Sequence, residues 1–500
     1  MLGVSSMFFL ASRPFASFAC AILTTATAVS TTCSSSGKWD LCSIGLSSET
    51  EVFWSDDLNF ANETTQRYTN YKPPTYSAAI VPTSETDVQK IVRFASEHNI
   101  SILATGGGHG FTTTLANLRD GLEIDLSSLK EISIDEKAST VTVGGGVLLK
   151  EIIEPLFNAG KELQTGPEAC VGLIGSTLGG GIGRLNGLHG LIIDSLISVR
   201  IVVASGELIT ASKTENSDLF WAIRGAGFNY GIVSSATYKV HDLSNGGEVM
   251  NADFLFPTNE TTTVFEFFKS LETTIPAELS LILNIGYRDS LGGTYVALNA
   301  VYFGSQDDGI PLIQPLVDAS PLQYNISTVP YLDLLSSAFF GASPSSAPCQ
   351  KNTLRNVYGI GLKNYDVPTL QKYFMNLTGI YANYPDVRDS VFFFEAFPMQ
   401  AARAVSDDET SYPHRDINGH LIFNYGYTDR SLDGIVNEFA VNARAEFAAN
   451  SGFDDIKNYV SYGHGDETAA QLYGEDKLPK LRALRAIWDS KGLFSFNEPF

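Results

Sequence analysis

The sequence predicts an α+β fold built from two domains, and three features of the chain indicate it. Short apolar strands alternate with helical periodicity between about residues 78 and 245. From about Gly246 the strand patterns become longer, as in 280–287 and 294–303, and they still alternate with helical stretches. Glycine-rich loops are confined to the first of these two regions. A chain of 500 residues is long enough for two domains with separate cores.

The first domain begins after an irregular stretch that ends at about Tyr76. Its first expected strand is 78–82, and the following Ser84 resembles a helix N-cap. Apolar residues then recur at helical spacing, at Val88, Ile91, Val92 and Ala95. The remaining expected elements are strands at 100–104, 122–126 and 140–143, a helix at 148–157, and a β-hairpin at 201–212 that turns at Ser205 and Gly206.

Residues 1–28 are expected to be a secretory signal peptide. Two apolar stretches separated by Arg13 lead into a tract of small residues with a cleavage region around Ala28. No apolar run reaches the roughly 18 residues that a membrane span needs. N-glycosylation sequons begin at Asn62, Asn99, Asn259, Asn325 and Asn376. We therefore expect a secreted, N-glycosylated protein, extracellular or in the cell wall.

The charge balance is strongly acidic, with 33 basic against 55 acidic residues and a formal net charge of −22. Nucleic acid and anionic membrane surfaces are therefore poor candidate partners. Solubility in an acidic extracellular medium accounts for the charge without any partner. We expect a monomer.

Three glycine-rich loops stand out in the first domain. Gly106, Gly107 and Gly108 directly precede His109, residues 172–183 hold six glycines, and a third loop spans 225–231. Consecutive glycines after a strand let backbone N–H groups approach a phosphate closely. No loop matches the dinucleotide-binding fingerprint in its context, and no Walker motif is present. Each loop by itself is more often a structural turn than a site, but three in one domain favour a phosphate-bearing cofactor.

These loops carry a resemblance to a known family. The sequence is similar to the FAD-binding domain of the vanillyl-alcohol oxidase superfamily and, more narrowly, to the berberine bridge enzyme-like oxidases, particularly secreted fungal members. The resemblance covers about 75–245 and 450–500 well, and the middle of the chain loosely. The matching motifs are Thr105 to His109, Val171-Gly172-x-x-Gly175, Leu178 to Gly181, Asp218 to Gly225, Tyr459 to Glu467 and Leu484 to Phe494.

The resemblance implies the domain organisation. It implies a PCMH-type FAD-binding domain of two subdomains at 75–245 and an α+β substrate domain with a large antiparallel sheet at 246–450. A C-terminal segment typical of the family, at 451–500, is then expected to return to the FAD-binding domain.

The resemblance also implies the cofactor and how it is attached. In this family the first glycine loop wraps the FAD pyrophosphate, and the histidine after it carries a covalent bond to the flavin 8α-methyl group. His109 is therefore the expected attachment site; the alternative is a histidine that only caps the loop by hydrogen bonds. The expected cofactor-binding residues are Thr105, Gly106, Gly107, Gly108, His109, Gly110, Gly172, Gly175, Ser176, Gly180, Gly181 and Ile232.

Many relatives attach the flavin a second time, through a cysteine that Glu168 replaces here. A glutamate cannot form that thioether, so we expect attachment through His109 only. Cys170 lies two residues too late and is expected to be an ordinary buried thiol. Cys33 and Cys42 could form a small disulfide, whereas the pairing of Cys170 and Cys349 cannot be deduced from spacing.

Two residues are candidates for the chemistry. By resemblance, Tyr462 is the base that takes a proton while hydride leaves the substrate, although Ser461 replaces the asparagine of the family motif. The alternative for Tyr462 is a packed aromatic with a satisfied hydroxyl. Asn424 lies where relatives place a residue facing the substrate. An asparagine can orient a substrate by hydrogen bonds but cannot act as a base.

No metal site is expected, because the spacings of His189, His414 and His464 fit no ligand set. Three functions stay open. The first is a secreted FAD-linked oxidase that passes hydride from a small organic substrate to FAD and then to O2, in fungal secondary-metabolite biosynthesis. The second is a carbohydrate oxidase that forms a lactone, and the third is a non-catalytic flavin-containing protein of the cell surface.

Overall fold

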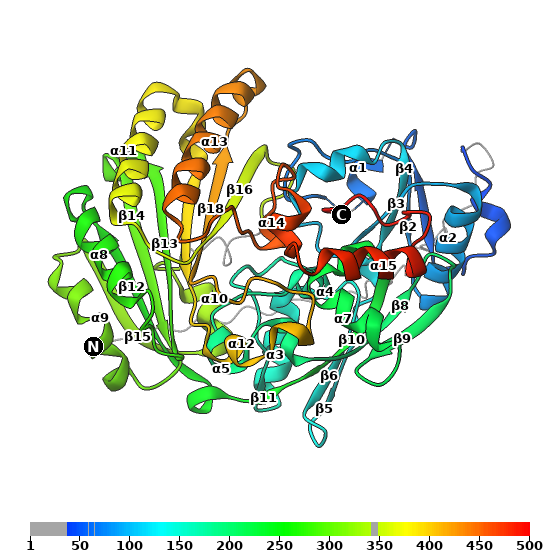
Figure 1. Ribbon diagram of the computed structural model, residues 1–500, viewed down its shortest axis with the longest axis horizontal. Coiled ribbons are helices and arrows are strands. Elements are labelled where there is room, and N and C mark those ends of the chain that lie inside the picture. The colour runs from blue at the N-terminus through cyan, green and yellow to red at the C-terminus, as the bar shows by residue number, and fades with distance from the viewer. Residues whose placement is uncertain (1–37, 59, 65, 342–348) are drawn as a thin grey trace, which may run out of the picture.

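The computed structural model describes residues 38–58, 60–64, 66–341 and 349–500. Two lobes lie side by side in Figure 1. One lobe, on the right, carries a four-stranded and a five-stranded sheet, and the other carries a seven-stranded sheet covered by long helices. The expected signal peptide, together with Cys33, lies outside the described residues.

The four-stranded sheet has the order β1-β2-β4-β3. Its strands are β1 (Glu51–Trp54), β2 (Tyr76–Val81), β4 (Gly121–Asp125) and β3 (Ile102–Thr105). The last three run parallel, so the chain needs a crossover between β2 and β3, and α2 (Glu85–His98) supplies it. Ser84 caps this helix by accepting a hydrogen bond from the Asp87 N–H. The expected strands and helix of this region are confirmed, and β3 delivers the chain into the first glycine loop.

The five-stranded sheet is antiparallel, with the order β5-β6-β10-β8-β9. Its strands are β5 (Ile132–Asp135), β6 (Thr140–Gly144), β10 (Ile232–Lys239), β8 (Leu196–Val202) and β9 (Leu208–Ser212). The expected hairpin is confirmed as β8 and β9. The helices of this lobe are α1 (Phe60–Glu63), α3 (Leu149–Asn158), α4 (Leu173–Gly179), α5 (Asn186–His189), α6 (Ile192–Ser195) and α7 (Ser217–Ala226), and a short ladder joins β7 (Lys161–Glu162) to β11 (His241–Asp242).

The second lobe is built on one large antiparallel sheet, which confirms the predicted fold class. Its strands, in order, are β15 (Gln323–Pro330), β12 (Glu248–Phe256), β14 (Gly293–Tyr302), β13 (Leu279–Arg288), β17 (Val391–Ala396), β18 (Gly419–Gly426) and β16 (Arg355–Leu362). The helices are α8 (Thr261–Leu271), α9 (Gln306–Asp318), α10 (Leu334–Ser337), α11 (Val367–Asn383), α12 (Gln400–Ala404) and α13 (Asp433–Asn450). The four longest, α8, α9, α11 and α13, bury their apolar residues against one face of the sheet. The other face is therefore left for the site.

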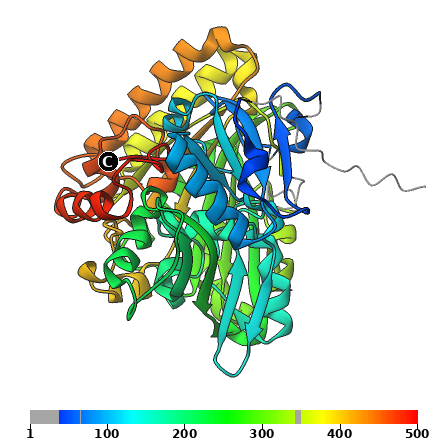
Figure 2. The same cartoon turned by 90° about the vertical axis from the view of Figure 1, so that its right-hand side faces the viewer.

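The C-terminal segment returns to the first lobe. It contains the 3-10 turn η12 (Val460–Tyr462) and the helices α14 (Ala469–Tyr473) and α15 (Leu478–Trp488). The red α15 packs on the green α7, as Figures 1 and 2 show, and the Tyr230 hydroxyl donates to the Leu481 carbonyl at 2.9 Å. The turn η12 lies against β16, so it joins the two lobes. Among the described residues, no helix is both long and apolar enough to cross a membrane.

Candidate functional site

Two glycine loops of the first lobe meet backbone to backbone. A Cβ atom at Gly107 would lie 2.6 Å from the Gly172 nitrogen and 2.9 Å from the Cys170 carbonyl oxygen, so no side chain fits there. Gly108 also has a left-handed φ of 67°. Gly107 and Gly108 are buried, and their N–H groups donate to no other residue that the structure describes. Because buried N–H groups are almost always paired, this cradle fits an anionic group such as the FAD pyrophosphate.

The second glycine loop, at the end of α4, is packed by residues from elsewhere in the chain. Gly180 has a φ of 133°, and a Cβ there would lie 2.7 Å from the Tyr412 ring. The Gly181 N–H donates to the Tyr459 hydroxyl at 3.1 Å, and that hydroxyl donates to the Ser176 carbonyl at 3.2 Å. The C-terminal segment therefore holds this loop in place.

The other expected cofactor residues lie around these loops, with one exception. The Thr105 hydroxyl donates to the buried Glu123 carboxyl group at 2.7 Å, and the Gly110 carbonyl accepts from Arg67 at 2.9 Å. Gly175 lies on α4 with open space where a side chain would be. Ile232 instead begins β10 and packs in the apolar core against the four-stranded sheet. Its role in cofactor binding stays a prediction.

His109 is stacked on a tyrosine that joins it to the second lobe. The rings of His109 and Tyr68 lie 4.3 Å apart with an angle of 16°, and the Tyr68 hydroxyl accepts from the Asn424 amide at 2.7 Å. Desolvation and the nearby Lys351 ammonium lower the pKa of His109 to about 4. The imidazole is therefore neutral near pH 7. A ring nitrogen must be unprotonated to form a bond to a carbon atom of the flavin. Asn424 contacts this stack through the Tyr68 hydroxyl and is not among the residues that line the cavity described below.

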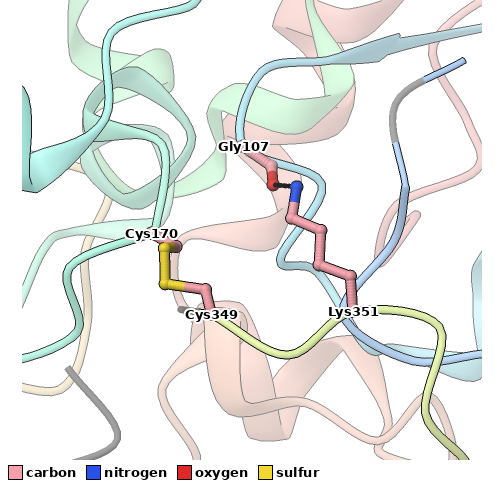
Figure 3. The surroundings of a disulfide bond; sticks show 4 residues. All are labelled: Gly107, Cys170, Cys349 and Lys351. Atoms are coloured by element: carbon pink, nitrogen blue, oxygen red, sulfur yellow. Dashed lines mark hydrogen bonds between the residues drawn. A yellow bond between two sulfur atoms is a disulfide. The ribbon is translucent and has the colours of Figure 1, made fainter. Parts of the chain in front are cut away.

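The expectation that Cys170 is a free thiol is wrong, because Cys170 and Cys349 form a disulfide (Figure 3). They are 179 residues apart in sequence, with Cα atoms 6.0 Å apart, so spacing could not reveal the pair. The bridge ties residues 349–351 of the second lobe to the first lobe. Lys351, two residues on, donates to the Gly107 carbonyl at 2.9 Å. The disulfide thus places a positive charge on the glycine loop.

A cavity lies between the lobes, next to the loop that holds Cys170. Its volume is about 30 Å³. Its polar lining comes from both lobes, and most of its wall is apolar. The lining residues are Pro167, Glu168, Arg184, Ile282, Asn284, Leu334, Leu335, Ala338, Phe339, Phe393 and Glu395. A small, largely apolar molecule with few polar groups matches this lining.

Glu395, at the edge of this cavity, is paired with Tyr462. The Tyr462 hydroxyl donates to the Glu395 carboxylate at 2.8 Å. Burial raises the pKa of Glu395 to about 7, although the hydrogen bond from Tyr462 opposes the shift. Burial and the facing Glu395 carboxylate raise the pKa of Tyr462 well above its usual value of 10. Near pH 7 the tyrosine is therefore protonated, and Glu395 is the group of the pair that can take up a proton.

Glu395 was missed by reading the sequence, although a signal was present. It is a lone carboxylate at the end of the apolar run Val391-Phe392-Phe393-Phe394 on β17. A charged residue in a buried strand is costly unless it is paired or functional. Its partner, Tyr462, comes from η12, so only the tertiary structure brings the two together.

The remaining predicted residues have structural surroundings. Ser461, between the two tyrosines, is close to Gly179, and its buried hydroxyl has no hydrogen-bond partner in the described part of the chain. His189 contacts Glu162 at 2.6 Å, and the His464 ring contacts the Val357 carbonyl at 2.9 Å. His414 is buried. Across residues 38–58, 60–64, 66–341 and 349–500, no cluster of three potential metal-ligating side chains occurs.

Comparison with known proteins agrees with the geometry. Residues 76–212 match the family described as FAD binding domain. The FAD-linked oxidoreductase azaL of Aspergillus niger is 42% identical over 463 residues, which cover 91% of this chain and 98% of that protein. The FAD-linked oxidoreductase tazG of Aspergillus terreus is 39% identical and covers 91% of this chain and 93% of its own.

Solved structures share the fold at lower identity. BBE-like 1 of Physcomitrella patens has a TM-score of 0.79 and 22% identity, and covers 90% of this chain and 96% of its own. A carbohydrate oxidase from Microdochium nivale has a TM-score of 0.77 and 21% identity, and covers 90% of this chain and 97% of its own. Identities this low show a shared fold and nothing about the substrate.

Proposed function

This chain belongs to the berberine bridge enzyme-like FAD-linked oxidoreductases, and from that premise we propose that it is an oxidase of a small organic molecule. In this proposal FAD, when bound, supplies the acceptor for a hydride, and O2 takes up the electrons afterwards. The observation that carries the proposal is the hydrogen bond from Tyr462 to Glu395, whose side chain lines a largely apolar cavity.

The chain's own residues account for the proton. The Tyr462 hydroxyl, which donates its hydrogen to Glu395, keeps lone pairs on its oxygen with which it can accept a substrate O–H or N–H. As the substrate loses hydride, its proton moves to the Tyr462 oxygen and the proton of Tyr462 moves to Glu395. This relay needs no free phenolate, which the raised pKa of Tyr462 disfavours.

Covalent attachment through His109 is part of the same proposal. Its support is the position of His109 directly after the glycine cradle and its neutral imidazole, which Tyr68 and Lys351 surround. Glu168 cannot supply the second bond, and the thiol of Cys170 is consumed in the disulfide. One bond to the flavin is therefore proposed.

Secretion and glycosylation are proposed as well. Asn99, Asn259, Asn325 and Asn376, which begin sequons, are all exposed. The Cys170–Cys349 disulfide is typical of a protein that folds in an oxidising compartment. We also propose a monomer, since the exposed apolar side chains of Met375 and Ile487 lie on different elements, α11 and α15.

The similar proteins suggest two substrate classes, secondary metabolites and oligosaccharides. We propose a substrate from fungal secondary metabolism rather than an oligosaccharide, because the wall offers few partners for many hydroxyl groups. A non-catalytic role would leave the buried Glu395–Tyr462 pair without a purpose.

The decisive experiment mixes the purified protein anaerobically with two sets of compounds. One set holds phenols and cyclic alcohols, and the other holds gluco-, xylo- and chito-oligosaccharides. Bleaching of the flavin by the first set, followed by peroxide release in air, supports the proposal. Bleaching by sugars alone would favour a carbohydrate oxidase. Bleaching without peroxide release would mean a dehydrogenase.

A further inference from the structure

Arg184 lines the cavity from the side of the FAD-binding lobe. It follows the second glycine loop directly, between α4 and α5, and its side chain reaches toward β13 and β14 of the large sheet. Only 7% of the residue is exposed. Glu395 lines the same cavity, as do Asn284 and Phe393 of the large sheet.

The hydrogen bonds of Arg184 go to neutral groups. One terminal nitrogen donates to the Ser280 hydroxyl at 3.1 Å, and the other donates to the Asn299 amide oxygen at 2.6 Å. These bonds use two of the five N–H donors of a guanidinium. Burial lowers the pKa of Arg184 to about 10, so the group is still charged near pH 7. No salt bridge of Arg184 is found among the described residues, and the carboxylate that attracts its charge most is Glu395, on the wall of the same cavity.

The carboxylate behind Asn299 is occupied elsewhere. Asp253 accepts from the Asn299 amide at 2.7 Å and from the backbone N–H groups of Phe339 and Phe340 at 2.7 and 3.0 Å. Both phenylalanines have left-handed φ values, 57° and 59°, which cost energy in a bulky residue. Asp253 thus stabilises the aromatic wall at Phe339, and its attraction to Arg184 passes through an amide.

A buried guanidinium with unused donors and no hydrogen-bonded carboxylate is costly by itself. We propose that Arg184 binds an acidic oxygen of the substrate. The substrate class is then a compact, mostly apolar ring compound that carries a carboxylate, phenolate or enolate oxygen. Arg184 holds that oxygen by its planar fork, while the apolar wall from Leu334 to Phe339 covers the ring. This inference rests on the proposed function, because it takes this cavity as the place of oxidation.

The test uses the flavin-containing protein and three probes: benzoate, benzyl alcohol and cellobiose. Binding is followed by the change in flavin absorbance at equilibrium. We expect benzoate to bind wild type more tightly than benzyl alcohol, and cellobiose to leave the spectrum unchanged. In Arg184→Gln the dissociation constant for benzoate should rise by about 10- to 100-fold, the range for a lost hydrogen bond to a charged group. Arg184→Lys, which keeps the charge, should lose less.

Benzyl alcohol is the matched control. Its dissociation constant should be the same in wild type and in Arg184→Gln, because it carries no acidic oxygen. Equal losses for both probes would show that Arg184 only shapes the cavity, and the inference would be wrong. It would be wrong also if wild type bound benzyl alcohol as tightly as benzoate, a result that needs no variant to fold. A wild-type protein without flavin would instead defeat the proposed function.

Discussion

The hydroxyl oxygen of Tyr462 lies 2.8 Å from a carboxylate oxygen of Glu395, across the junction between the C-terminal segment and the large sheet. Neither residue has an ordinary pKa in this pair. The pKa of the Glu395 carboxyl group is raised to about 7, and the pKa of the Tyr462 phenol is raised well above 10. The relationship makes the two side chains one proton-accepting unit, and it leads to the following predictions.

Tyr462→Phe should slow flavin reduction by ~10²–10⁴-fold, the usual contribution of a positioned acid or base. The change removes only the phenol oxygen, so flavin binding should survive. Tyr459→Phe is the matched control, since the Tyr459 hydroxyl contacts the Gly181 N–H and the Ser176 carbonyl and should matter much less. Stopped-flow reduction of both variants by a true substrate measures the difference. Equal, modest losses in both would place the base elsewhere.

Glu395→Gln should slow flavin reduction about as much as Tyr462→Phe, because an amide cannot take up the proton. The double variant should reduce its flavin only slightly more slowly than either single variant, because the effects of residues that act together do not add. If the rate losses of the two single variants multiplied in the double variant, the two residues would act independently.

The wild-type reduction rate should rise with pH through about 7. The relay needs the Glu395 carboxylate, which is protonated below that pH. Glu395→Gln should remove this rise.

The raised pKa of Glu395 also affects stability. A carboxyl group with a raised pKa in the folded state lowers the free energy of unfolding as pH rises from about 4.5 to about 7. Glu395→Gln should therefore melt at a higher temperature than wild type at pH 8, and at a similar temperature at pH 4.

His109→Ala should release the flavin on denaturation. Wild-type protein precipitated with acid should stay yellow, and one flavin-bearing peptide, containing His109, should appear in mass spectrometry. A colourless wild-type pellet would disprove covalent attachment, and a flavin on any other residue would disprove the single bond.

The paired change Cys170→Ser and Cys349→Ser should lower the free energy of unfolding by about 2–5 kcal/mol, as the loss of a native disulfide commonly does. It should also loosen Lys351 from the Gly107 carbonyl and thereby decrease the fraction of covalently held flavin. Lys351→Met, which keeps the disulfide, is the control that separates the charge from the bridge. An unchanged melting temperature in the double serine variant would contradict the prediction.

Local features of the fold and site were predictable because their cause lies in neighbouring residues. The periodic apolar residues of α2, the β8–β9 hairpin and the strand before Gly106 follow from spacing over a few positions. The glycines before His109 indicated a close backbone approach, and the structure shows what approaches Gly107: Gly172 and the Cys170 carbonyl.

By itself, then, the sequence determined the family, the alternation of strands and helices, and the glycine loops that fit FAD, since these are short-range patterns. Only the tertiary structure decided which distant groups meet. The Cys170–Cys349 bridge, the Glu395–Tyr462 pair and the stack of Tyr68 on His109 each join segments that no local pattern relates. The physical reason is burial. Closing the two lobes removes Glu395 and Arg184 from water, and that desolvation gives ordinary side chains their unusual charge states.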